Sequence, residues 1–167
     1  MVKDYDVEVE WKSFELRPEG VDVPAHSPEY MERAKAGVES MSKQYGIEMK
    51  WNNKSEHSRH ALEGAKFADV EGKTDAYHEA VFRAQFQRDK AINDIDTLVD
   101  IAKSIGLDPV AFKEALESRK FESAVLSDIE EASQIGITGI PCYISENKGV
   151  MGAQSYESLV ELINGGK

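Results

Sequence analysis

The sequence of 167 residues predicts an α/β chain, and three observations lead to this fold class. Near the N-terminus, apolar and charged side chains alternate, which is typical of a half-buried strand. The middle of the chain is a series of short apolar patterns at helical spacing, separated by capping residues and glycines. Near the C-terminus, two short β-rich runs flank a turn, and a last helical pattern follows. The predicted order is strand, several helices, two strands and a helix.

The first strand is predicted at residues 7–14. Apolar residues from Val7 to Trp11 alternate with charged ones, so one face of the strand is expected to be buried. The alternation shifts near Ser13, which predicts a bulge in the strand. Residues 17–26 contain prolines and a glycine and are expected to form an ordered but irregular connection.

Helical patterns with clear start and stop signals fill the middle of the chain. The helices are expected at residues 28–45, 58–69, 74–88, 94–105, 109–118 and 122–135. Their predicted start signals are Ser27 with Pro28, Thr74, Asp94, and Asp108 with Pro109. Glycines at positions 46, 106 and 136 supply stop signals.

The C-terminal part predicts a hairpin and a closing helix. The run from Cys142 to Ile144 and the pair Val150–Met151 flank turn residues at 146–149, which is the pattern of two antiparallel strands. Ser155 is then placed to cap the last helix. No repeat or low-complexity segment interrupts the series of elements.

The charge balance excludes one class of partner. The chain carries 31 acidic and 20 basic side chains, and its net charge of −11 would repel a phosphate backbone, so no nucleic-acid partner is expected. The first residues are acidic and lack the features of a signal peptide. No stretch approaches the ~18 apolar residues that span a bilayer. A cytoplasmic protein without a membrane partner is therefore expected.

One C-terminal motif carries a family resemblance. Residues 136–144 read Gly-Ile-Thr-Gly-Ile-Pro-Cys-Tyr-Ile, and Val-Met-Gly-Ala-Gln follows at 150–154. Together they closely resemble the cis-proline strand and the Gly-Ala-Gln segment of DsbA-family proteins, with the FrnE-like branch the nearest. Residues 11–16, Trp-Lys-Ser-Phe-Glu-Leu, are similar to the second thioredoxin strand of that family, and residues 58–63 are similar to its inserted helical domain.

The resemblance implies an incomplete thioredoxin-like fold with an inserted all-helical domain. Residues 1–26 and 122–167 would form the thioredoxin-like part, and residues 27–121 would form the insertion. In this family a first strand and a Cys-x-x-Cys or related motif precede the strand that resembles residues 11–16, but here only ten residues do, and none is cysteine.

The implied fold leaves a gap in the sheet. The family's first strand lies between the strand at 7–14 and the hairpin strand at 142–145, so both would keep unpaired backbone groups on the sides that face the gap. We expect a homodimer in which a second copy supplies the missing ladder. Direct pairing of the two strands is the alternative.

The resemblance also implies a substrate-binding segment. It consists of Gly139, Ile140, Pro141 and Cys142, and the Ile140–Pro141 peptide bond is expected to be cis. No catalytic residue is assigned. Cys142, the single cysteine of the sequence, is interpreted as a small buried hydrophobe rather than as a reactive thiol.

Histidines offer a weaker site hypothesis. His57 and His60 are three residues apart, and with His78 and Glu79 they could be combined into a metal site. Nothing in the sequence fixes the second pair relative to the first, so surface histidines are the preferred interpretation. No metal and no cofactor are expected.

The implied activity is that of a protein disulfide oxidoreductase. It would exchange disulfides with a polypeptide thiol or disulfide substrate, although this chain lacks the dithiol. One alternative is a glutathione-dependent isomerase or transferase, similar to 2-hydroxychromene-2-carboxylate isomerase or to kappa-type glutathione transferases. A second alternative is a non-catalytic peptide-binding or regulatory protein.

Overall fold

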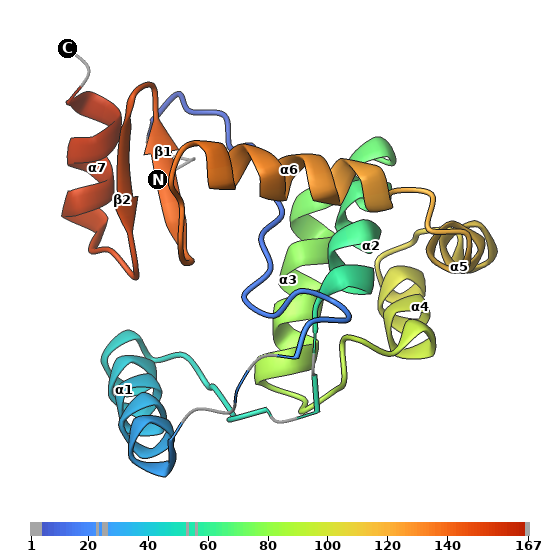
Figure 1. Cartoon of the computed structure of the whole chain (residues 1–167), viewed down its shortest axis with the longest axis horizontal. Helices are drawn as coiled ribbons and strands as arrows, with labels where there is room; N and C mark the ends of the chain where they lie inside the picture. The colour runs from blue at the N-terminus through green and yellow to red at the C-terminus, as the bar shows by residue number, and fades with distance from the viewer. Residues whose placement is uncertain (1–4, 23, 25–26, 53, 56, 166–167) are drawn as a thin grey trace. The chain divides into compact units, whose positions relative to one another are not determined.

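A computed structural model of the chain describes residues 5–22, 24, 27–52, 54–55 and 57–165. They form two compact units: Arg17–Val125 make up the helical unit, and the described residues up to Leu16 and from Leu126 onward make up the terminal unit (Figure 1). In the part of the chain that is described, every helix is too short or too polar to cross a membrane. The cytoplasmic location stays a prediction.

Helices dominate the structure, as the sequence predicts. They are α1 (Pro28–Tyr45), α2 (Arg59–Val70), α3 (Thr74–Phe86), α4 (Ile95–Ser104), α5 (Pro109–Glu117) and α6 (Glu122–Gln134). All six predictions between residues 28 and 135 are confirmed, with ends that differ by at most two residues. The boundary between the two units falls within α6.

Three of the predicted N-caps are confirmed by hydrogen bonds. Ser27 Oγ accepts from the Tyr30 amide at 3.2 Å, and Asp94 Oδ2 accepts from the Thr97 amide at 2.8 Å. Asp108 Oδ1 accepts from two amides of the first turn of α5. Each bond satisfies a backbone donor that the helix itself leaves unpaired, so these helices begin where the sequence places them.

The predicted cap at Thr74 is wrong. Lys73 occupies the N-cap position of α3, and Thr74 is the first helical residue. The Thr74 hydroxyl instead donates to Asp69 Oδ1 at 2.8 Å, across the turn that joins α2 to α3. The Thr74 hydroxyl therefore forms a hydrogen bond with a nearby carboxylate instead of capping the helix.

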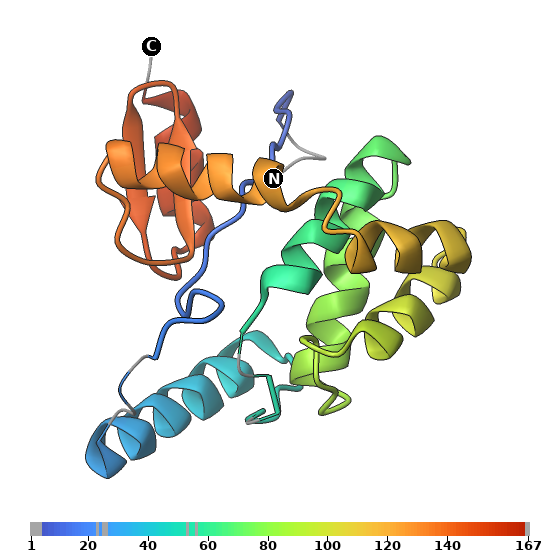
Figure 2. The same ribbon diagram turned by 45° about the vertical axis from the view of Figure 1, so that its right-hand side comes forward.

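The apolar core lies in the helical unit, where α2 packs on α3, α4 and α5 (Figure 2). Tyr77 and Phe112 are almost fully buried at its centre. The ring of Phe112 meets the ring of Phe67 edge-on, with centroids 5.3 Å apart. Gly64 lies against this group: a Cβ at position 64 would overlap Tyr77 Oη and lie 2.7 Å from Phe112 Cζ. The close approach of α2 to these rings therefore requires glycine.

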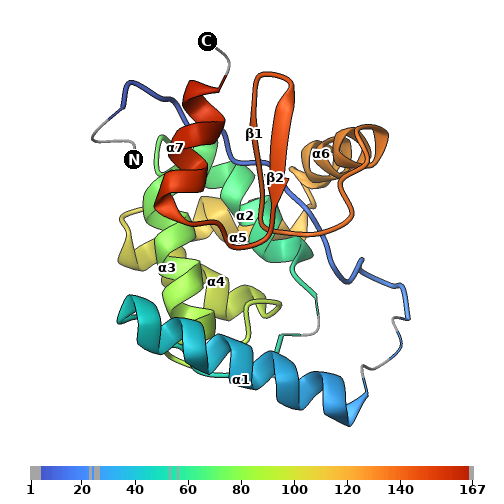
Figure 3. The ribbon, with the colours of Figure 1, turned by 90° about the vertical axis from the view of Figure 1, so that its left-hand side faces the viewer.

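The terminal unit contains the predicted hairpin and closing helix. β1 (Cys142–Ser145) pairs antiparallel with β2 (Lys148–Met151), and Cys142 lies opposite Met151. Helix α7 (Tyr156–Asn164) contacts both strands and runs beside them (Figure 3). Ser155 caps it through a 3.2 Å hydrogen bond from the Ser158 amide. Both predictions for this region are confirmed.

The predicted strand at residues 7–14 is wrong. The described residues 5–16 contain no strand, and the sheet of the described chain consists of β1 and β2. Side chains of α6 hold the segment instead: the buried Ser13 amide donates to Asp128 Oδ2 at 2.7 Å, and Lys12 Nζ lies 3.2 Å from Glu131 Oε2. An alternating pattern makes a strand only beside another strand, and residues 7–14 have none. The direct pairing with β1 and the bulge near Ser13 are therefore wrong as well.

Candidate functional site

The segment Gly139–Cys142 joins the turn after α6 to the hairpin. Its Ile140–Pro141 peptide bond is cis. The Pro141 carbonyl accepts a hydrogen bond from the Gly152 amide at 2.8 Å, which extends the ladder by one pair beyond the first residue of β1. The side chain of Ile140 is 49% exposed. The hairpin therefore fixes one end of the segment, while its Ile140 and Pro141 side chains face solvent.

Cys142 is the first residue of β1 and carries a free thiol. Its side chain is half-buried rather than buried, so the interpretation as a small core residue does not describe it fully. The thiol directly follows the exposed residues Ile140 and Pro141 in the sequence.

The outer edge of β1 is open among the described residues. Because Pro141 and Gly152 form a hydrogen-bonded pair, the next such pair in an antiparallel ladder is Tyr143 with Val150. The N–H and C=O groups of Cys142 therefore point away from β2, where the described chain places no other strand. Such an edge is a template for an added strand.

The terminal unit also leaves much apolar surface unburied. Among its described residues, Ala132 is the only buried apolar side chain. Its large exposed apolar side chains are Val9, Trp11, Leu16, Leu126, Ile135, Ile140, Tyr143, Ile144, Met151 and Tyr156. A surface of this composition is typical of a region that another polypeptide covers.

The histidines considered for a metal site are not brought together. The rings of His57 and His60 lie 6.2 Å apart, whereas His78 lies on α3 with its ring 6.0 Å from Phe82. His60 Nε2 lies 2.7 Å from an Arg119 nitrogen, which can only donate, so this ring nitrogen accepts. Within the described ranges, no group of three or more His, Cys, Asp or Glu side chains could hold a metal ion.

Sequence reasoning missed the fully buried carboxyl of Glu63 on α2. Its side chain is fully buried, and burial raises the pKa of its carboxyl to about 7. The signal was present in the sequence, because Glu63 lies four residues from Phe67 and four from Arg59, and all three are buried on one face of α2. The apolar residues of this pattern predict the helix, whereas the spacing of Glu63 to Phe67 is what places a carboxyl on its inner face.

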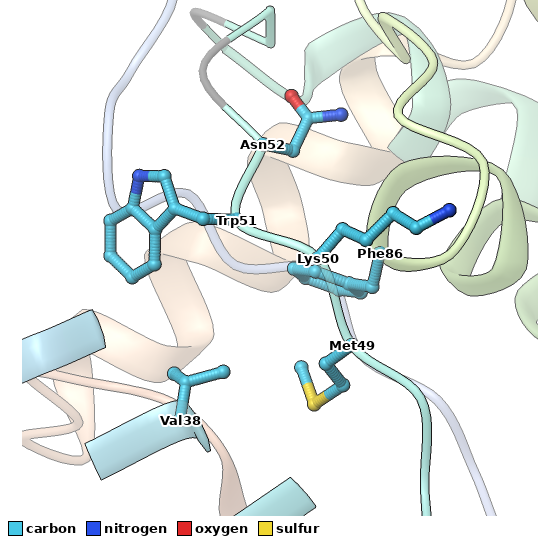
Figure 4. A pocket seen from close by; sticks show the side chains of 6 residues that line it. All are labelled: Val38, Met49, Lys50, Trp51, Asn52 and Phe86. Carbon is cyan, nitrogen blue, oxygen red and sulfur yellow. The ribbon is translucent and has the colours of Figure 1, made fainter. Parts of the chain in front are cut away.

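A small hollow lies in the helical unit between α1 and the residues that follow it. Its volume is about 110 Å³, and it is lined by Val38, Met49, Lys50, Trp51, Asn52 and Phe86 (Figure 4). The Lys35 ammonium lies 5.6 Å from the centre of the Trp51 ring. The lining is almost wholly apolar and offers no carboxylate, thiol or imidazole, so it provides no groups for acid–base or thiol chemistry.

A family model and a known relative each match most of the chain. The model of the DSBA-like thioredoxin domain matches residues 1–164. The uncharacterized protein YwbO of Bacillus subtilis (strain 168) is 35% identical over 157 residues, which cover 91% of this chain and 78% of the relative.

Two solved structures share the fold. A probable DsbA oxidoreductase from Streptomyces coelicolor superposes with a TM-score of 0.72 at 24% identity, over 84% of this chain and 62% of the other. A 2-hydroxychromene-2-carboxylate isomerase superposes with a TM-score of 0.69 at 20% identity, over 81% of this chain and 64% of the other. The chain thus spans less than two thirds of the length of either of these two structures.

Proposed function

Because the chain belongs to the DSBA-like thioredoxin domain family, we propose that it takes part in thiol–disulfide exchange with polypeptides. The observation that carries this proposal is the segment Gly139–Cys142, where the exposed Ile140 and Pro141 side chains directly precede the half-buried thiol of Cys142. In this proposal the segment contacts the substrate polypeptide near the sulfur atoms that react.

The chemistry requires two thiols. A thiolate attacks one sulfur of the substrate disulfide, a mixed disulfide forms, and the other substrate sulfur leaves as a thiolate. A second thiolate then attacks the mixed disulfide and releases the reduced substrate. The sequence holds one cysteine, Cys142, so the pair comes from another molecule or from a longer form of the protein. In this proposal Cys142 lies beside the substrate and is not the nucleophile.

We expect the 167-residue chain to reduce insulin no faster than its Cys142→Ala variant. The reason is that the chain has no second thiol and that, in this proposal, Cys142 is not the nucleophile. The assay follows insulin turbidity with dithiothreitol and, separately, with glutathione as reductant. Both can resolve a mixed disulfide from outside, so turnover depends on whether Cys142 attacks insulin. Turnover that disappears in the Cys142→Ala variant would show that Cys142 is itself the nucleophile.

A second copy of the chain is the proposed partner of the terminal unit. The open edge of β1 and the exposed Tyr143 and Ile144 side chains support this proposal, because an added strand would pair the free backbone groups and cover apolar surface. A stable interface of this kind buries more than ~1,000 Å².

Sedimentation at micromolar concentration is expected to give a dimer. A lysine in place of Ile144 puts a charge on the β1 edge and is expected to give a monomer, because lysine on an edge strand opposes pairing. Val110→Lys, at a residue of the helical unit that is 74% exposed, is the matched control and should remain dimeric. A wild-type monomer that binds no apolar dye contradicts the proposal.

The fold shared with the isomerase structure favours one alternative, a glutathione-dependent isomerase. Calorimetry with reduced glutathione separates the two functions. Saturable binding that survives in the Cys142→Ala variant supports the isomerase alternative, since it requires no disulfide. Binding of an oxidised peptide without glutathione binding supports the exchange function, or a peptide-binding role without catalysis.

A further inference from the structure

Several side chains of the helical unit share the guanidinium of Arg119. Its Nε lies 3.3 Å from Glu63 Oε1. One terminal nitrogen donates to Glu122 at 2.8 Å and also to Glu19, and the other lies against His60. Arg119 follows α5 with a φ of 55°, a left-handed conformation that few residues other than glycine adopt. The turn after α5 thus presents one cation to α2, to α6 and to the segment around Glu19.

We propose that Glu63 and Glu19 compete for Arg119, so that the ionisation of Glu63 controls how firmly residues 17–22 are held on the helical unit. When Glu63 is neutral, Arg119 holds Glu19 and the segment is anchored. When Glu63 is ionised, the guanidinium turns toward the buried carboxylate and the segment is released. The device is independent of the proposed exchange activity, because it uses none of the residues 139–142.

The burial of the Glu63 carboxyl explains why its ionisation can change the contacts of Arg119. Neither of its oxygens accepts a hydrogen bond from the described residues, although the side chain is fully buried. A neutral carboxyl tolerates this arrangement, whereas an ionised one requires donors. Burial raises its pKa to about 7, while Arg119 and Arg59 lower it and Glu122 and Glu19 raise it. Its charge therefore changes near neutral pH.

In this proposal Glu19 is the carboxylate that Arg119 releases when Glu63 is ionised. Glu122 also accepts from Arg59 at 3.1 Å, so it keeps a cationic partner when Arg119 moves. Glu19 has its described ion pair with Arg119, and this pair lowers the pKa of the Glu19 carboxyl against the effect of burial. Two imidazoles, those of His57 and His60, also face Glu19 and contribute to the lowering of its pKa. The test must separate their effect from that of Glu63.

Hydrogen exchange of the full chain at pH 6 and pH 8 measures the release directly. The ionised fraction of Glu63 rises from about one tenth to about nine tenths between these values, given a pKa near 7. After correction for intrinsic rates, residues 17–22 of the wild type should exchange several-fold faster at pH 8 than at pH 6. In Glu63→Gln they should exchange at the slow rate at both values, although both histidines remain.

Two further variants complete the test. Glu39→Gln removes a carboxylate that pairs with Lys43 on the exposed α1, and it should behave as the wild type. Glu19→Gln removes the ion pair with Arg119, and residues 17–22 should then exchange fast at both pH values. This variant tests the proposal even if Glu63→Gln does not fold.

Equal protection of the wild type at pH 6 and pH 8 overturns the proposal. So does a Glu63→Gln variant that keeps the wild-type response, since a group other than Glu63 would then cause it.

Discussion

Gly64→Ala is expected to destabilise the protein by about 2–4 kcal/mol, because the new methyl group has no room. It would overlap Tyr77 Oη and approach Phe112 Cζ within 2.7 Å, and both rings are almost fully buried. Alanine favours the helix by about 1 kcal/mol over glycine, but displacing two core rings costs more. Urea unfolding, followed by the helical circular dichroism signal, measures the loss.

Gly37→Ala is the matched control. Gly37 also lies within a helix, α1, and a Cβ there meets no atom within 4 Å. This substitution should stabilise the protein slightly, by up to about 1 kcal/mol, through helix propensity alone. If both variants were equally stable, the close packing of α2 on Tyr77 and Phe112 would be disproved.

Glu63→Gln is expected to flatten the pH dependence of stability between pH 5 and pH 8. The pKa of Glu63 is about 7 in the folded chain and 4.5 as its ordinary value. Between these values the folded state holds a proton that the unfolded chain has released, so the free energy of unfolding falls as the pH rises through this window. By pH 8 the fall attributable to Glu63 reaches about 3 kcal/mol, and glutamine removes it.

Unfolding free energies of the wild type and the variant at pH 5, 6, 7 and 8 test this expectation. The range stays above pH 5 because the pKa values of Glu19 and Glu122 are lowered, so their contributions are lost only as the pH falls further. Glu39→Gln should follow the wild type. Parallel curves for the wild type and Glu63→Gln would mean that Glu63 titrates in the folded protein as it does in the unfolded chain.

The helical part could be predicted from the sequence because its signals are local. A cap such as Asp94 and a proline such as Pro109 act within one turn of helix, without help from distant residues. The hairpin was equally accessible, since the turn at 146–147 and the two short runs beside it are adjacent in sequence.

The predicted strand at residues 7–14 is wrong because strand formation depends on residues that are distant in the sequence. Alternation describes what a segment would do beside another strand, and the described chain places none beside it. The bond from the Ser13 amide to Asp128 joins residues 115 positions apart, and no local pattern reports it. The same holds for the ion pairs of Arg119 with Glu19 and Glu63, which lie far from it in the sequence.

For the candidate site, the sequence indicates a segment but not the backbone groups around it. The resemblance assigned Gly139–Cys142 from one contiguous motif, and the structure places this segment at the start of the hairpin with Ile140 exposed. The open edge of β1 beyond Cys142 depends on which backbone groups the ladder uses, which only the register in space reveals.

The arrangement of the helical core has a consequence for the order of folding during synthesis. Within the helical unit, α2 packs on α3, α3 on α4, and α4 on α5, so many of the core contacts join neighbours in sequence. Contacts of this kind close short loops and form quickly, and N-terminal parts of a chain leave the ribosome first. The helical unit can therefore complete its core before β1 and β2 are made. The hairpin is translated afterwards and therefore pairs late, after the helical core has formed.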